Sequence, residues 1–221
     1  MYMKKYWIYL MVAAAAAMFG GACTSAKDSE PETPGTEIPG KPGDTEGSED
    51  NSGTPDSPDT PDAGGKTLVA YFSWSGTTQR MAEEIVRQTG ADIFRIEPVK
   101  PYPTEYTPCT EVARDEKDAN ARPAIAAKVE NWEQYDTVFI GCPVWWWTTP
   151  MIICTFAESY DFHNKTVIPF CTYASTYRDE TLARIVELTP DAAHLTGEGL
   201  TSGMVNEKNI SSWLKEIGIT R

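Results

Sequence analysis

The chain has 221 residues, of which 41% are hydrophobic and 23% are charged, and its formal net charge is -13. This length allows one ordinary domain with additional sequence, or two small domains, and excludes a large multidomain protein. The excess of acid argues against nucleic-acid binding through a basic face, because neutralising phosphates requires clustered lysine and arginine.

Residues 1–23 have the pattern of a secretory signal. Lys4 and Lys5 precede an apolar stretch that runs from Tyr6 to Phe19, and small residues then lead to Cys23. This arrangement resembles the lipobox of bacterial lipoproteins, in which the cysteine is acylated and becomes the mature N-terminus. We therefore expect lipidation of Cys23; a plain signal peptide or a short membrane anchor is the alternative interpretation. A permanent spanning helix is disfavoured, because the apolar run is shorter than the roughly 20 residues that a bilayer requires.

Residues 24–65 are predicted to form a disordered, acidic linker. They contain seven prolines, seven glycines and eleven acidic residues against two lysines, with almost no large apolar side chain. Such a segment cannot bury enough surface to offset the entropy lost on ordering. We therefore expect an exported, membrane-anchored lipoprotein on the periplasmic or cell-surface face, whose folded domain lies in residues 66–221.

The folded domain is predicted to alternate strands and helices. Its apolar runs and helical patterns fall, in chain order, into strand 68–72, a helix ending at Gly90, strand 93–99, helix 105–120, strand 138–141, helix 151–159, strand 167–171, helix 179–188, a weak strand 192–200 and helix 206–217. This alternation predicts an α/β fold with five parallel strands and helices on both faces.

Two of the predicted strands carry residues that restrict their position. Arg95 and Glu97 interrupt the second strand, so we place it at a sheet edge. Pro169 lies inside the fourth apolar run and has no amide hydrogen to donate to a neighbouring strand. A bulge or an unusual strand end is therefore expected near Pro169.

The loop after the first strand has the chemistry of a phosphate site. Ser73, Ser75, Thr77 and Thr78 supply hydroxyls around Gly76, immediately before a predicted helix. Backbone amides and the helix dipole can hold a phosphate there without a basic side chain. The alternative interpretation is that Thr77 and Thr78 only cap the helix. Nucleoside triphosphate binding is not indicated, because the loop has no Gly-Lys-Ser or Gly-Lys-Thr.

Two further loops are rich in aromatic residues. In the segment 141–150, Trp145, Trp146 and Trp147 cannot all point into one core, so at least one should face a cleft, a partner or solvent. Residues 172–177 add phenols and hydroxyls at the end of the next strand. Ligands of such sheets bind at the carboxyl ends of the strands. A flat aromatic ligand with a phosphate, such as flavin mononucleotide (FMN), would use all three loops.

Three segments, 68–78, 141–146 and 161–172, together resemble the flavodoxin family, in particular flavodoxin-like domains of bacterial exported lipoproteins. The resemblance covers nearly all of residues 66–221. It implies a doubly wound sheet in the order 2-1-3-4-5 and FMN held without a covalent bond. By position, the residues that would bind FMN are Ser73, Trp74, Ser75, Gly76, Thr77, Thr78, Pro143, Val144, Trp145, Trp146, Trp147, Thr172, Tyr173, Ala174 and Ser175.

The resemblance implies electron transfer, or flavin-dependent reduction of a small acceptor, with an unknown redox donor and acceptor. Because the phosphate loop has no cation, we expect a low reduction potential. The alternative is a non-enzymatic binding module that has lost flavin, because Trp147 and Tyr173 stand where the family usually has small residues and would fill the pocket. A hydrolase is not indicated, since no nucleophile elbow is visible.

The remaining cysteines and histidines do not form a catalytic or metal-binding pattern. Without a Cys-x-x-Cys motif, a zinc or dithiol site is not expected. Cys142 and Cys171 would end neighbouring strands, so a disulfide is possible in an exported chain. Buried free thiols are favoured, because adjacent parallel strands rarely meet disulfide geometry. His163 and His194 are expected to be structural or solvated.

Overall fold

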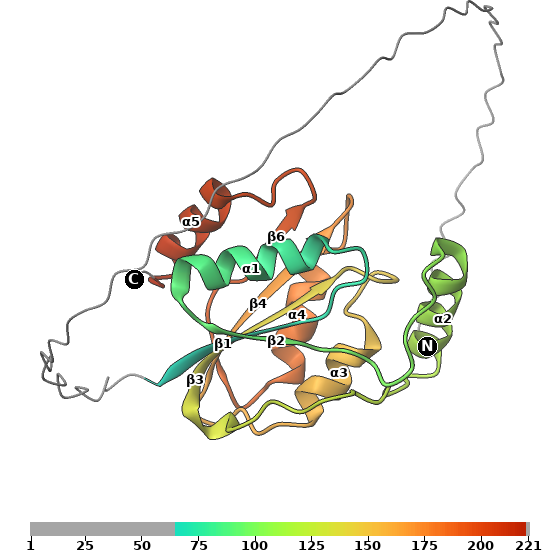
Figure 1. The fold of residues 1–221 in the computed structure, drawn as a ribbon, viewed down its shortest axis with the longest axis horizontal. Helices are drawn as coiled ribbons and strands as arrows, with labels where there is room; N and C mark the ends of the chain where they lie inside the picture. The colour runs from blue at the N-terminus through green and yellow to red at the C-terminus, as the bar shows by residue number, and fades with distance from the viewer. Residues whose placement is uncertain (1–64, 220–221) are drawn as a thin grey trace, which may run out of the picture. The chain divides into compact units, whose positions relative to one another are not determined.

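A parallel sheet forms the centre of the structure, a computed structural model that describes residues 65–219. The predictions for residues 1–23 and for the linker up to residue 64 lie outside the described residues. The strands run in the order β2-β1-β3-β4, with β5 and β6 both paired to β4 (Figure 1). Their bounds are β1 Lys66–Tyr71, β2 Asp92–Arg95, β3 Tyr135–Pro143, β4 Thr166–Tyr173, β5 Ala193–His194 and β6 Glu198–Thr201.

Helices cover both faces of this sheet, as predicted (Figure 1). They are α1 Thr77–Thr89, α2 Tyr106–Asp118, α3 Met151–Glu158, α4 Arg178–Leu188 and α5 Glu207–Glu216, with a short 3-10 turn, η1, at Trp132–Gln134. Helices α1 and α5 pack on one face, and α3 and α4 on the other. Helix α2 instead lies beside α3, away from the sheet faces (Figure 1). Within the described residues, no helix combines the length and the apolar character needed to cross a bilayer.

The strands are buried on both faces, which explains their continuous apolar runs. On one face, β-strand residues such as Val69 and Phe139 pack with Met81 and Ile85 of α1 and with the apolar side of α5. On the other face, residues including Ile140 pack with α3 and α4. Each fully buried aliphatic or aromatic side chain contributes roughly 1.5–3 kcal/mol, so this central region supplies most of the hydrophobic stabilisation.

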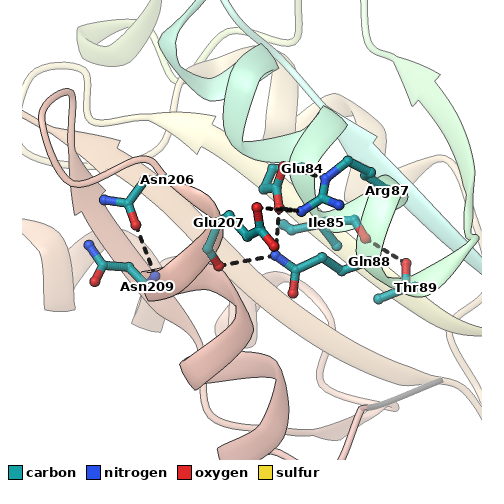
Figure 2. Close-up of polar contacts among 8 residues, drawn as sticks. All are labelled: Glu84, Ile85, Arg87, Gln88, Thr89, Asn206, Glu207 and Asn209. Atoms are coloured by element: carbon teal, nitrogen blue, oxygen red, sulfur yellow. Dashed lines mark hydrogen bonds and ion pairs between the residues drawn. The ribbon is translucent and has the colours of Figure 1, made fainter.

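Polar contacts join α1 to the start of α5 (Figure 2). Nη2 of Arg87 lies 3.3 Å from Oε2 of Glu207, and the Gln88 side-chain amide donates to the Glu207 carbonyl at 3.2 Å. Asn206 caps α5, because its Oδ1 accepts a hydrogen bond from the Asn209 amide at 3.0 Å. The two helices of this face are thus linked by their polar ends as well as by their apolar sides.

The predicted irregularity at Pro169 appears as a break in the neighbouring strand. β5 pairs with β4 up to Val167, and β6 pairs with β4 from Phe170 onward, so the gap between β5 and β6 falls opposite Pro169. A Cβ at Gly197, inside this gap, would lie 2.7 Å from the Pro169 ring. The prediction of one continuous strand over 192–200 is therefore wrong, because the missing amide and the close backbone approach divide it.

The second strand is at the sheet edge, as predicted, but is shorter than predicted. The Ile96 amide still donates to the Tyr71 carbonyl of β1 at 2.7 Å, but after Ile96 the chain leaves β1, and residues 97–99 pair with residues 124–126 instead. The Val99 amide donates to the Ala124 carbonyl at 2.8 Å, and the Ala126 amide donates to the Glu97 carbonyl at 2.8 Å. This local antiparallel pairing covers the edge where the predicted strand would have continued.

Candidate functional site

The three predicted loops meet at the carboxyl ends of β1, β3 and β4 and enclose an open cleft. Its volume is about 660 Å³, within the range of roughly 300–1,000 Å³ that is usual for small-molecule sites. Twelve of the fifteen predicted binding residues line it, namely Trp74, Ser75, Thr77, Pro143, Val144, Trp145, Trp146, Trp147, Thr172, Tyr173, Ala174 and Ser175. The structure therefore brings together residues that are up to 101 positions apart in the chain, Trp74 and Ser175.

The loop that precedes α1 leaves the start of this helix without a side-chain cap. Gly76 is the N-cap residue, with a φ of 86°, and no side chain accepts a capping hydrogen bond there. The Gly76 amide donates to Oγ of Ser73 at 3.1 Å, which closes the loop. Thr77 and Thr78 thus do not cap α1, and that alternative interpretation is wrong. The positive end of the helix dipole is directed to the loop.

Thr78 contributes to this site from a buried position. Its side chain is buried, and its Oγ1 shares a hydrogen bond of 2.7 Å with Oγ1 of Thr172. The Thr78 hydroxyl therefore joins the first loop to the third and does not line the cleft. Ser73 is also buried, with its hydroxyl used inside the loop.

A cation reaches the first loop from outside it. Nη2 of Arg95, on β2, donates to the Ser73 carbonyl at 3.4 Å, and Nη1 donates to the Gln79 side chain at 3.3 Å. The same guanidinium lies 3.3 Å from the Glu97 carboxylate. The loop's own sequence contains no cation, but Arg95 on the neighbouring strand β2 places a positive charge beside it.

Trp146 and Trp147 form the centre of a tight turn in an unfavourable backbone conformation. The amide of Trp145 donates to the Thr148 carbonyl at 2.9 Å, and the Thr148 amide donates back to Trp145 at 3.1 Å. The two residues between them have φ values of 45° and 72°. Such turns usually contain Asn-Gly, because left-handed backbone costs most residues other than glycine, asparagine and aspartate about 1–2 kcal/mol.

The three successive indoles have different environments, as the sequence predicted. Trp145 packs edge-on against Phe72 with ring centroids 5.1 Å apart. Trp146 donates its Nε1 hydrogen to the Thr110 carbonyl of α2 at 2.7 Å. Trp147 is 55% exposed. One indole thus packs against the core from the cleft wall, one binds α2 and one faces outward.

Helix α2 supplies a wall of the cleft that sequence reasoning missed. The residues that line it are Tyr106, Cys109, Thr110 and Ala113. Their spacing of three, four and seven places them on one side of the helix, and this spacing was the available signal. Burial, together with the negative charge of Glu116, raises the pKa of the Cys109 thiol, so it is present as the neutral form. Ser202, Thr176 and Tyr177 complete the lining.

The mouth of the cleft is formed by exposed aromatic residues. The rings of Trp147 and Tyr177 lie 6.0 Å apart between centroids, at an interplanar angle of 39°. Nζ of Lys117 lies 5.6 Å from the Trp147 ring centroid. Trp147 therefore packs at the rim, and the volume of the cleft remains open beside the half-buried Tyr173.

The cysteines of the described residues are free and buried. Cys142 and Cys171 occupy paired positions on β3 and β4, as the resemblance implied. Burial raises the pKa of both thiols, that of Cys171 to about 12. Among residues 65–219, no cluster of histidine, cysteine and carboxylate side chains could hold a metal ion.

Comparison with known proteins agrees with this architecture. A family model described as flavodoxin matches residues 66–217. A candidate flavoprotein from Bacteroides eggerthii is 36% identical, with 71% of this chain and 99% of that chain covered and a TM-score of 0.61. A second candidate flavoprotein, from Bacteroides uniformis, is 35% identical, with 69% of this chain and 99% of that chain covered and a TM-score of 0.62. A flavoprotein in complex with FMN from Lactobacillus acidophilus is 22% identical, with 67% of this chain and 98% of that chain covered and a TM-score of 0.57. None of the curated proteins matches.

Proposed function

Because this chain belongs to the flavodoxin family, we propose that it binds FMN without a covalent bond and transfers electrons to a small acceptor. The observation that carries the proposal is the open cleft formed by the loops after β1, β3 and β4, with the start of α1 beside it. The Lactobacillus acidophilus flavoprotein, which shares this fold, is in complex with FMN.

The first loop fits the phosphate of FMN. The uncapped first turn of α1 supplies backbone amides and the positive end of a helix dipole, and Ser75 and Thr77 line the cleft next to it. Such a helix start favours an anion by typically 0.3–1 kcal/mol, and more when partly buried. Arg95 adds a positive charge behind the loop, through its contact with the Ser73 carbonyl.

The second and third loops fit the flat ring system. Trp145 and Trp146 face the cleft from the end of β3, and Tyr173 and Ala174 from the end of β4. The bound flavin would supply the capacity to accept and release electrons, while the protein fixes its position and electrostatic surroundings. The aromatic walls would exclude water from the ring, and the loop amides would hold the phosphate.

The visible absorption spectrum of the full-length protein, recorded before and after addition of FMN, tests this proposal. We expect bound FMN after gel filtration. Gly76→Ala should weaken FMN binding by about tenfold, because left-handed backbone at a φ of 86° costs alanine about 1–2 kcal/mol and the free loop would relax away from the conformation that holds the phosphate. Gly203→Ala is the matched control, since a Cβ there also meets no atom within 4 Å but the backbone is not left-handed. A colourless protein that cannot be reconstituted would instead favour the binding module.

We also propose that lipid on Cys23 tethers this protein to a membrane. The support is the sequence pattern of residues 1–23 and the acidic linker that follows. Several acyl chains would anchor the chain firmly, since each buried methylene contributes about 0.8 kcal/mol. Mass spectrometry of the mature N-terminus should find an acylated Cys23, and Cys23→Ser should move the protein out of the membrane fraction. An unmodified N-terminus elsewhere would contradict the tether.

A further inference from the structure

We propose that the electron acceptor of this protein is a small, flat, uncharged aromatic oxidant of the quinone class, which stacks on Trp147 and Tyr177 at the mouth of the cleft. The proposal rests on the proposed function, because the electrons must come from a flavin bound deeper in the same cleft. It concerns the exposed ends of the second and third loops, at the mouth of the cleft, whose other residues would hold the cofactor.

The first observation is a concentration of exposed aromatic rings at this mouth. Within residues 65–219, the large apolar side chains that are exposed include only a few aromatic residues, Tyr106, Trp147 and Tyr177, and all of them line the same cleft. They come from α2, from the turn after β3 and from the residue before α4. Exposed rings on three separate elements thus surround one opening, which a flat aromatic ligand can enter and contact on its faces.

The second observation is that two of these rings stand on strained backbone. Trp147 has a φ of 72° and Tyr177 has a φ of 64°. Left-handed backbone costs a residue with a Cβ about 1–2 kcal/mol, and burial of these exposed rings does not offset that cost. Strain of this kind is concentrated at ligand sites. Glycine or asparagine at either position would avoid this cost. The aromatic rings therefore serve a contact that glycine and asparagine cannot make.

The third observation is the absence of charge from the cleft. In the described part of the chain, no residue that lines the cleft is Asp, Glu, Lys, Arg or His, although 23% of the whole sequence is charged. Protein partners of small electron carriers are usually selected by complementary charged rims, which steer their encounter. Lys117 contacts the outer side of the rim at Trp147, but the aromatic lining itself carries no charge and favours an uncharged aromatic molecule over a protein acceptor.

The proposed reaction balances without a further co-reactant at the mouth. A 1,4-quinone takes up two electrons and two protons, and each C=O double bond becomes a C–O–H group. The electrons come from the reduced flavin, which is oxidised, and the protons come from the reduced flavin and from solvent. Nothing in the cleft wall needs to donate a proton, which agrees with the lack of ionised side chains there.

The test uses the full-length protein with bound FMN and tetramethyl-1,4-benzoquinone, which is fully substituted and so does not add to the Cys109 thiol. Calorimetry on the oxidised protein measures quinone binding without turnover. Asparagine tolerates left-handed backbone, so Tyr177→Asn and Trp147→Asn remove a ring without adding strain. We expect each to raise the quinone Kd by about tenfold, the loss typical of one stacked aromatic contact. Val99→Asn, at an exposed site that does not line the cleft, should leave it unchanged.

A second measurement separates stacking from a structural role. After reduction with one equivalent of dithionite, re-oxidation by the quinone should be several-fold slower in Tyr177→Asn, while re-oxidation by ferricyanide, which does not stack, should keep its rate. A quinone Kd that is unchanged in both variants overturns the proposal. So does an equal loss of rate with both oxidants, or faster oxidation by cytochrome c that is independent of Tyr177. Failure to retain FMN at all would refute the proposed function, and the two failures are therefore distinguishable.

Discussion

The hydroxyls of Thr78 and Thr172 lie 2.7 Å apart and share a buried hydrogen bond between positions separated by 94 residues. Thr78 is in the first turn of α1, and Thr172 is near the end of β4. The bond therefore joins the loop proposed for the phosphate to the loop proposed for the ring. Both side chains are buried, so neither hydroxyl can exchange this partner for bulk water.

Thr172→Val should destabilise the protein by about 1–2 kcal/mol, because it leaves the buried Thr78 hydroxyl without a partner. FMN affinity should fall as the two loops lose their connection. Urea unfolding and FMN titration measure these effects. The double variant Thr78→Val with Thr172→Val removes both hydroxyls and should recover part of the lost stability. A double variant that shows the full sum of the two single losses would argue against a direct bond.

Trp146→Phe should release α2 from the turn after β3, because it removes the hydrogen bond from Nε1 to the Thr110 carbonyl. We expect a loss of about 1 kcal/mol in unfolding free energy and faster amide hydrogen exchange in α2. Trp213→Phe is the matched control, since it removes a similar bond from Trp213 Nε1 to the Thr196 carbonyl at 2.9 Å. Trp213→Phe should lower the unfolding free energy by a similar amount but leave amide hydrogen exchange in α2 unchanged. Equal exchange in α2 of both variants would show that Trp146 does not hold this helix.

Lys165→Met should destabilise the fold by about 2–4 kcal/mol, because two buried carbonyls lose their donor. Nζ of Lys165 donates to the carbonyls of Trp132 and Tyr135, and it lies 5.0 Å from the Trp132 ring centroid. Lys165 precedes β4, at the end of the sheet opposite the cleft, so FMN affinity should not change. Urea unfolding measures the loss. The exposed Lys208→Met serves as the control, and equal stability of the two variants would refute the role of Lys165.

His194 should make the protein less stable as the pH falls below about 6.5. Burial lowers the pKa of His194 in the folded state below its ordinary value of 6.5. The unfolded chain therefore binds a proton more readily than the folded protein. The free energy of unfolding decreases as the pH falls from about 6.5 towards the lower pKa of the folded state. His194→Gln should lose this dependence. Unfolding free energies of both proteins at about pH 7.5 and about pH 5.5 measure the difference.

Other titrating groups do not obscure that comparison. Glu84 and Glu158 have pKa values lowered by hydrogen bonds from arginine, and they lose their stabilising effect only at more acidic pH. Burial raises the pKa of Glu116, which acts in the opposite direction. All of these groups are common to the wild type and the variant, so their effects cancel. If His194→Gln keeps the wild-type change in unfolding free energy between the two pH values, another group is responsible for the pH dependence.

The reduction potential of FMN bound to this protein should lie below that of free FMN. The reason differs from the one that the sequence suggested, because Arg95 does place a cation beside the first loop. The lining of the cleft, however, is uncharged within the described residues, and a dry uncharged site disfavours added negative charge on the ring. Ala174→Lys, which would place a cation on the cleft wall, should raise the potential. Redox titration of both proteins measures it, and a wild-type potential above that of free FMN would contradict the expectation.

The order of strands and helices along the chain was predictable from the sequence, because burial on both faces leaves a continuous apolar run in each central strand. The three loops were also predictable, since parallel strands bring their carboxyl ends to one edge. The unusual composition of residues 145–147 correctly indicated that one indole faces outward. These features depend on local patterns that tertiary contacts reinforce.

Features that depend on contacts through space were not predictable. Arg95 reaches the first loop across a neighbouring strand, and the chain pattern does not reveal that contact. Helix α2 has only Cys109 and Ala113 buried, so its residue spacing marked one side of the helix but did not show that this side would form a wall of the cleft. The division of the last predicted strand depends on the approach of Gly197 to Pro169.

That division also affects how this protein behaves at high concentration. One border of the sheet consists of two short segments, Ala193–His194 and Glu198–Thr201, with an interruption between them. At the other border, residues 124–126 cover the chain just beyond β2. Long, flat borders invite other chains to add to a sheet and begin aggregates. Pro169 and Gly197 therefore interrupt the border at which another chain could pair, at the cost of a few backbone hydrogen bonds.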